Sequence, residues 1–189
     1  MAKLKKCKRY IQTKKKALGF LNADFIWKEC DHMSCSIFGD ALLIPPVSLC
    51  SVTNYQGNME KMNTLVNSEL TNNPAILKLI GYNNLELMYE NHGYHVRFMY
   101  TVFHLNAYEL LASVIIWVYR SYHRRGFSYE YFSVELSAWQ RAASTSLTPE
   151  AAAEINRVYQ WMIDHHDDFM AFAESPDYQT IPFVSVCTR

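Results

Sequence analysis

Apolar positions recur every three or four residues from Met59 to the neighbourhood of Ala173, which is the spacing of one helix face. Helix-capping and helix-breaking residues interrupt this pattern at regular points. The pattern predicts helices over residues 59–70, 74–81, 83–104, 107–125, 128–143 and 148–173. Long helices joined by short loops favour a mainly α fold, an antiparallel four-helix-type bundle.

Residues 17–58 differ from the helical region in composition and in the spacing of their apolar positions. Three of the five cysteines and a Pro45-Pro46 pair lie here, and the short apolar run 41–44 is bounded by residues that break helices. The run predicts a strand, and the segment predicts a small cap, either irregular or a short β-hairpin. We therefore divide the chain into a basic tail (1–16), this cap (17–58), the helical bundle (59–175) and a C-terminal tail (176–189).

Two histidines occupy apolar positions of the helix predicted over 83–104. Its apolar stripe consists of Leu85, Met88, His92, His95, Met99 and Val102. His165 falls on the apolar stripe of the helix predicted over 148–173, and Glu135 falls on that of 128–143. Gly93, between the two histidines, predicts a bend or the close approach of another group, because a mid-helix glycine costs about 1 kcal/mol relative to alanine.

Histidines and a carboxylate that project inward from facing helices are how helical bundles build metal sites. His92, His95, His165 and Glu135 are therefore candidate ligands of zinc, iron or manganese. A second interpretation is a tetrapyrrole, a haem or corrinoid held by one of these histidines. Its candidate enclosing residues are Met88, Met99, Trp161 and Phe169. A third interpretation is a polar core in which tyrosines, carbonyls or acids satisfy the histidines.

A second candidate metal or cluster site lies in the cap. Cys30, Cys35 and Cys50, with His32 between the first two, provide zinc or iron–sulfur ligand types. The spacing contains no Cys-x-x-Cys pair, which is the usual mark of such sites. Reduced thiols buried under the cap are the alternative, and an odd number of cysteines without an export signal favours them.

Charge is distributed unevenly although the net charge is zero. Residues 1–16 carry eight of the eighteen Lys and Arg and no acid, which leaves ten basic and eighteen acidic residues in 17–189. Such a tail predicts contact with an acidic protein surface or with nucleic acid, and a solvated terminus is the alternative. No apolar run is long enough to span a membrane, and no secretory signal is recognisable, so we expect a cytoplasmic protein.

Composition and motifs limit the functional classes. Half of the residues are hydrophobic, which excludes wholesale disorder. Phosphate-binding loops, dinucleotide-binding glycine patterns, nucleophile elbows and His-Glu-x-x-His motifs are absent from the sequence. We therefore expect a non-catalytic bundle that binds a metal or small cofactor in a sensory or regulatory role. A metal-dependent enzyme using the same residues, and a structural or adaptor subunit without a cofactor that binds a protein partner or a second copy, are the alternatives.

Overall fold

The computed structural model describes residues 34–176, and the chain divides into two compact units, Met1–Leu43 and Ile44–Arg189. The described residues form eight helices and no strand, which confirms the prediction of a mainly helical fold. The helices are α3 (Ser34–Ala41), α4 (Leu49–Thr71), α5 (Ile76–Ile80), α6 (Leu85–Leu105), α7 (Tyr108–His123), α8 (Glu130–Ser146), α9 (Pro149–Asp164) and α10 (His166–Glu174).

The strand predicted over residues 41–44 is wrong. Ala41 is the last residue of α3, and the chain then turns, with the Leu42 N–H bonded to Phe38 O and the Leu43 N–H bonded to Asp40 O. A short apolar run has the same composition at a helix end as in a strand, so its sequence does not separate the two. The basic tail, residues 17–33 of the predicted cap and residues 177–189 lie outside the described residues.

The first long helix begins at Leu49 rather than at Met59. Ser48 caps it, because its side chain accepts a hydrogen bond from the Ser51 N–H at 3.3 Å. Its first turns carry polar residues and Gly57, which interrupt the apolar spacing on which the prediction depended. Residues 49–58 therefore belong to a helix, although the sequence placed them in the cap.

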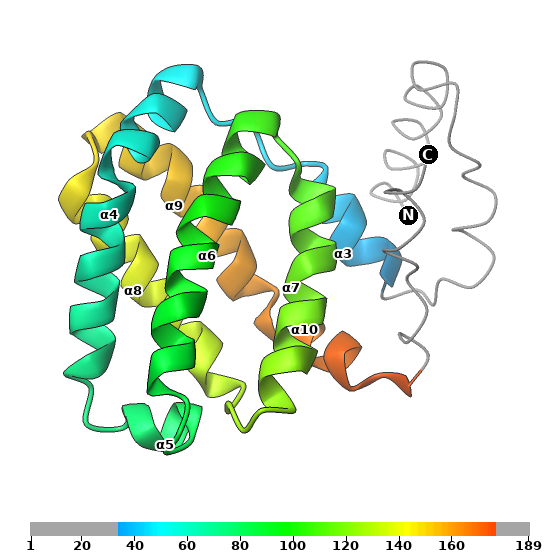
Figure 1. Cartoon of the computed structure of the whole chain (residues 1–189). Helices are drawn as coiled ribbons and strands as arrows, with labels where there is room; N and C mark the ends of the chain where they lie inside the picture. The colour runs from blue at the N-terminus through cyan, green and yellow to red at the C-terminus, as the bar shows by residue number, and fades with distance from the viewer. Residues whose placement is uncertain (1–33, 177–189) are drawn as a thin grey trace, which may run out of the picture. The chain divides into compact units, whose positions relative to one another are not determined.

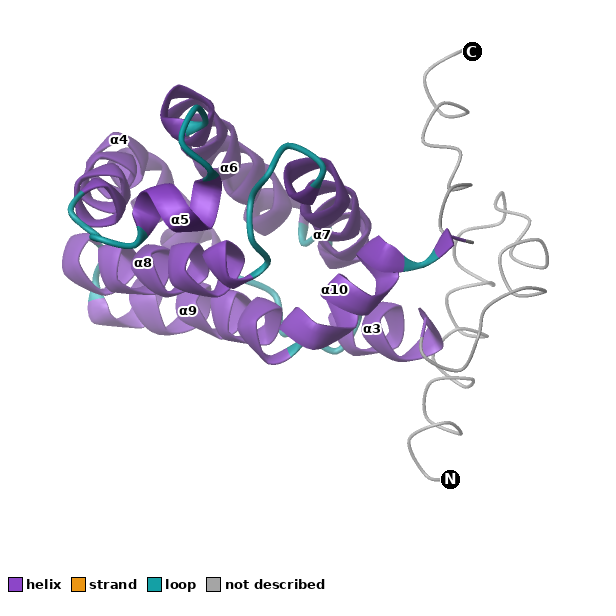
Figure 2. Ribbon diagram, turned by 90° about the horizontal axis from the view of Figure 1, so that it is seen from below, coloured by secondary structure: helices purple, strands orange, loops and turns teal. Residues whose placement is uncertain are grey.

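In the second unit α4 packs against α6, α8 and α9, and α8 also packs against α9 (Figure 1). The short helix α5 lies across one end, against α6 and α8 (Figure 2). α7 packs on α6 and mainly on α10. The largest side chains buried between these helices are aromatic: Trp139, Tyr55, Tyr131, Tyr159, Phe103, Phe127 and Phe169.

The last predicted helix is two helices. α9 ends at Asp164 and α10 begins at His166, because His165 leaves helical geometry with φ −104° and ψ 17°. The change of direction lets α10 pack on α7, where Phe169 contacts Tyr119 with ring centroids 5.8 Å apart. Neither proline nor glycine marks this break, so the periodicity alone predicted one continuous helix.

Asn106 ends α6 in the left-handed conformation, with φ 51° and ψ 42°, and α7 begins after Ala107. Its Oδ1 accepts a hydrogen bond from the Val47 N–H at 3.2 Å, which ties the segment before α4 to the α6–α7 connection. Asparagine tolerates this conformation better than most residues, because its short polar side chain bonds locally.

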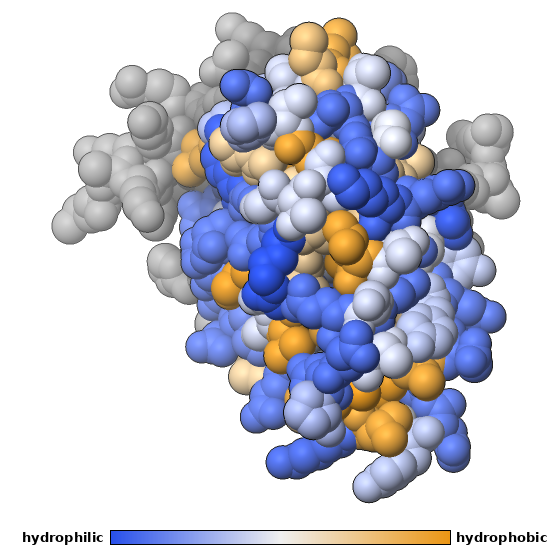
Figure 3. Space-filling view, turned by 90° about the vertical axis from the view of Figure 1, so that its left-hand side faces the viewer, coloured by the Kyte–Doolittle hydropathy of each residue, from blue (hydrophilic) through white to orange (hydrophobic). Residues whose placement is uncertain are grey.

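The surface on the α4 side of the molecule is mostly hydrophilic, with small separate apolar areas (Figure 3). Within residues 34–176 no helix is both long enough and apolar enough to cross a membrane.

Gly93 neither bends α6 nor admits a close neighbour. The helix is continuous from Leu85 to Leu105. A Cβ at Gly93 would meet only the end of the Arg97 side chain, at 3.6 and 3.8 Å, which is ordinary van der Waals contact. The close approach predicted from this glycine is therefore not found among the described residues.

Gly93→Ala should stabilise the protein by about 0.5–1 kcal/mol, because it removes backbone entropy from the unfolded chain at a helical position with room for the methyl group. The free energy of unfolding from urea titrations measures the effect. Gly81→Ala is the contrasting control: Gly81 has φ 79°, so a side chain there is strained and the variant should be less stable than the parent. A loss of stability in Gly93→Ala would contradict this account.

Candidate functional site

His92 lies in the core of the second unit and has no solvent exposure. Its Nδ1 is 2.5 Å from Asn67 Oδ1 on α4, and its Nε2 is 2.8 Å from the Tyr131 hydroxyl on α8. Both bonds are satisfied when Nδ1–H donates to Asn67 and Nε2 accepts from Tyr131. One neutral imidazole thus joins three helices, and both of its nitrogens are occupied.

Glu135 is the acidic member of this cluster. It is 7% exposed, and its Oε1 lies 3.8 Å from His92 Nε2. The indole N–H of Trp139, one helical turn further along α8, donates to the same oxygen at 3.3 Å. The prediction that Glu135 and His92 both point inward from facing helices is confirmed.

His95 extends the cluster toward α9. Its ring stacks on Trp139 with centroids 4.8 Å apart, and its Nε2 is 3.2 Å from the Tyr159 hydroxyl. That hydroxyl lies 3.5 Å from the hydroxyl of Tyr55 on α4, which donates to Val96 O at 3.4 Å. Hydrogen bonds, together with the stacking of Trp139 on His95, therefore connect α4, α6, α8 and α9. We call these eight residues the core network: Tyr55, Asn67, His92, His95, Tyr131, Glu135, Trp139 and Tyr159.

Burial favours the neutral form of every titratable group in the core network. It lowers the pKa of His92 from 6.5 to about 4 and raises the pKa of Glu135 from 4.5 to about 7, with the Trp139 hydrogen bond opposing the latter shift. Burial, with a contribution from His92, also lowers the pKa of His95. The tyrosine pKa values are raised for the same reason. Near pH 6 the pair is a neutral imidazole beside a carboxylic acid, and above pH 7 the carboxylate carries a buried charge.

His165 lies at the α9–α10 junction. Its Nδ1 bonds to Trp161 O at 3.0 Å, and its ring lies 5.0 Å from the Trp161 ring. Among the described residues, no group of three or more His, Cys, Asp or Glu side chains is placed to hold a metal ion. The structure therefore brings together His92, His95 and Glu135, and it does not place His165 with them as a ligand group.

The four candidate residues for enclosing a cofactor are divided between two places. Met88 and Met99 are fully buried on α6. Trp161 contacts Phe169 edge-on at 5.6 Å on the α9–α10 side. Two grooves lie on the surface along α4, and none of these four residues lines either groove.

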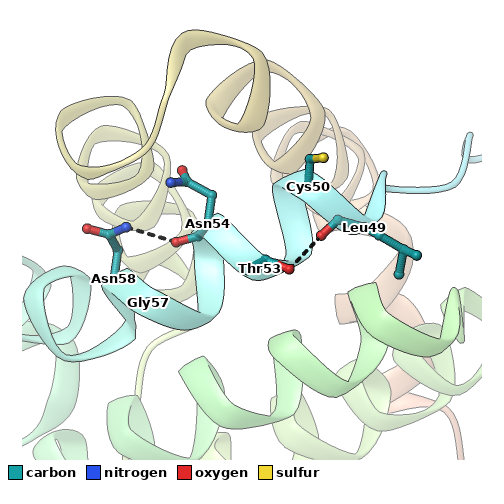
Figure 4. Close-up of a pocket in the computed structure, with 6 residues that line it drawn as sticks. All are labelled: Leu49, Cys50, Thr53, Asn54, Gly57 and Asn58. Carbon is teal, nitrogen blue, oxygen red and sulfur yellow. Dashed lines mark hydrogen bonds between the residues drawn. The ribbon is translucent and has the colours of Figure 1, made fainter.

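The two grooves are open to solvent. The first, about 510 Å³, is lined entirely by α4 residues: Leu49, Cys50, Thr53, Asn54, Gly57 and Asn58 (Figure 4). The second, about 470 Å³, is lined by residues of α4 with polar side chains and by Tyr89 of α6, and it includes Asn67, the partner of His92. The core network thus reaches the surface at Asn67.

The candidate site in the cap is only partly described. Cys30 and His32 lie outside the described residues, and Cys35 lies in α3. Cys50 is exposed as a free thiol in the first turn of α4. The alternative interpretation, a thiol buried under the cap, is therefore wrong for Cys50.

Sequence reasoning missed the partners that satisfy the histidines. Asn67 is adjacent to the apolar Val66, and its sequence position alone indicates a solvated residue. Tyr131 is adjacent to the apolar Phe132. Their polar ends give no periodic signal, because a hydrogen-bonding tip is compatible with either face. The only available indication was the number of tyrosines, thirteen in the chain.

Comparison of the chain with protein-family models, with curated proteins and with solved structures found no match.

His92→Ala should lower the free energy of unfolding by about 2–4 kcal/mol, because it leaves Asn67 and Tyr131 without their buried partner and opens a cavity. Urea denaturation followed by circular dichroism measures this change. His104→Ala is the matched control: His104 is exposed on the same helix, and its removal should change stability by less than about 0.5 kcal/mol. Equal effects of the two substitutions would show that the network does not stabilise the core.

Proposed function

We propose that this chain is a non-catalytic helical domain with a regulatory role, in which the His92–Glu135 pair makes the packing of α4, α6, α8 and α9 responsive to protonation. One observation carries the proposal: both nitrogens of a buried histidine are held by side chains from two other helices, with a carboxyl group 3.8 Å away. The antiparallel four-helix bundle is part of this proposal, supported by the contacts of α4 with the other three helices.

The same geometry supports a non-catalytic role. A general acid or base acts on a substrate within hydrogen-bond distance, directly or through one water. His92 has no exposure and Glu135 only 7%, and each polar atom of His92 faces a protein partner. The network therefore contains catalytic residue types in an arrangement that serves packing.

Ionisation of Glu135 is the step that would change the packing. Above pH 7 the Glu135 carboxylate accepts a hydrogen bond from the Trp139 indole N–H. Burial and the charge on Glu135 raise the pKa values of Tyr122 and Tyr131. A buried charge with few donors is costly, so the helices that enclose it are favoured to separate or admit water. Protonation restores the neutral pair and the tighter packing.

Glu135→Gln should become more stable relative to the parent as the pH rises. The folded chain holds the Glu135 proton more tightly than the unfolded chain, because the pKa rises from 4.5 to about 7 on folding. Raising the pH through this window therefore lowers the parent's free energy of unfolding, by on the order of 1–3 kcal/mol, and glutamine removes the loss. Urea titrations at pH 5.5 and pH 8 measure the difference.

The control for this experiment is Glu154→Gln. Its carboxylate accepts the Ser48 N–H and its pKa is lowered, so its titration is complete below pH 5.5. The stability difference from the parent should therefore be the same at both pH values. A Glu135→Gln difference that does not change with pH would favour a structural or adaptor subunit without a protonation switch.

Binding of a metal or tetrapyrrole by His92, His95, His165 and Glu135 is the competing function. It would require His92 to release Asn67 or Tyr131, and His165 to move from the α9–α10 junction. We expect purified protein to lack a stoichiometric metal and a Soret band, and chelators to leave its unfolding midpoint unchanged. Metal analysis and an absorption spectrum test this expectation. A metal bound at one per chain and lost in the His92→Ala, His95→Ala double variant would replace our proposal.

A further inference from the structure

Two loops are joined at one end of the second unit, the α5–α6 loop and the α7–α8 loop (Figure 1). The Asn84 side-chain N–H groups donate to Ile80 O at 2.6 Å and to Arg125 O at 2.8 Å, so one side chain ties the loops together. The Ser128 N–H adds a bond to Leu79 O at 2.7 Å. These bonds fix the loops relative to each other.

The joined loops display cations. Lys78, Arg124 and Arg125 are all exposed, and no ion pair to any of them is found within residues 34–176. Arginine and lysine at helix C-termini complement the helix dipole, which explains their position on α5 and α7. Because these side chains are exposed, their charged ends are also available to a ligand.

Aromatic rings accompany the cations. Tyr82, on the α5–α6 loop, is 84% exposed, the highest value among the large hydrophobic residues. On the other loop, His123 stacks on Tyr129 with centroids 4.2 Å apart and planes 10° apart. The His123 Nδ1 lies 3.1 Å from Phe127 O, which fixes the ring of this second aromatic group. Flat aromatic surfaces therefore lie on both loops.

We propose that this surface, formed by Lys78, Tyr82, His123, Arg124 and Arg125, binds single-stranded nucleic acid. Cations that contact phosphates, together with exposed rings on which bases stack, are the two components of sequence-tolerant single-strand binding. A duplex does not present unstacked bases to Tyr82, and an acidic peptide offers no base to stack. Single strands use both components.

Two nearby acids limit the electrostatic component. Glu86 and Glu130 are exposed in the first turns of α6 and α8, which begin at the same two loops. They reduce the net positive charge of the surface, so stacking on the rings has to add to the affinity that the phosphate contacts supply. This distinguishes the surface from residues 1–16, where eight cations occur without an acid.

The test is fluorescence anisotropy of the full chain with a labelled single-stranded RNA of about 20 nucleotides over a series of salt concentrations. The Arg124→Ala, Arg125→Ala double variant should bind about tenfold more weakly, with a salt slope reduced by about 1.4. Tyr82→Ala should bind about fivefold more weakly with an unchanged slope, because stacking releases no counterions.

A matched pair on the same domain provides the control. Tyr94 is 63% exposed on α6, and the Arg97 guanidinium lies 5.2 Å from its ring centre. Tyr94→Ala and Arg97→Ala should leave binding unchanged. Three results would overturn the proposal. The α6 variants could lose as much affinity as the loop variants, duplex could bind more tightly than single strand, or polyglutamate could compete as well as unlabelled single strand. Binding that disappears only when the cations of residues 1–16 are replaced by glutamine would also overturn it. The proposal does not rest on the protonation switch at Glu135.

Discussion

The structure of the second unit depends on satisfying one buried imidazole. An unpaired polar group in the interior costs more than its hydrogen bond contributes when formed, so His92 needs a partner for each nitrogen. Asn67 on α4 and Tyr131 on α8 supply them. Because each bond tolerates only small displacements, the three helices have one register in which both are made. A purely apolar interior would allow several registers of similar energy.

The same constraint determines what chemistry the interior supports. The groups nearest His92 accept or donate hydrogen bonds, and they do not leave an open position for a metal or a substrate atom. What can still change is the number of protons. The pKa of His92 is about 4, so its imidazole is neutral in the physiological range. The pKa of Glu135 is about 7, so its carboxyl group loses its proton and becomes negatively charged within that range. The proton is therefore the ligand that we propose for this site.

Periodicity predicted the parts of this structure that depend on local spacing. The stripe of α6 and the inward positions of His92 and Glu135 followed from steps of three and four residues. His165 was misplaced because the break between α9 and α10 arises from packing against α7, which no local signal marks. The start of α4 was missed because its first turns are polar. Asn67 was missed because a polar residue at the edge of an apolar face gives the same pattern whether it is solvated or bonded to a buried group.

Helix α8 connects the interior to the surface formed by the two loops. Ser128, just before it, bonds to Leu79 O, and Tyr131 and Glu135 follow within about two helical turns. Displacement of α8 by a charge on Glu135 would act on the Ser128 bond and on the arginines that precede it. The reverse also holds: a strand bound across both loops would restrain α8 and oppose ionisation of Glu135. Linkage requires the two effects to be equal in free energy, so the interior protonation and the surface would form one coupled system.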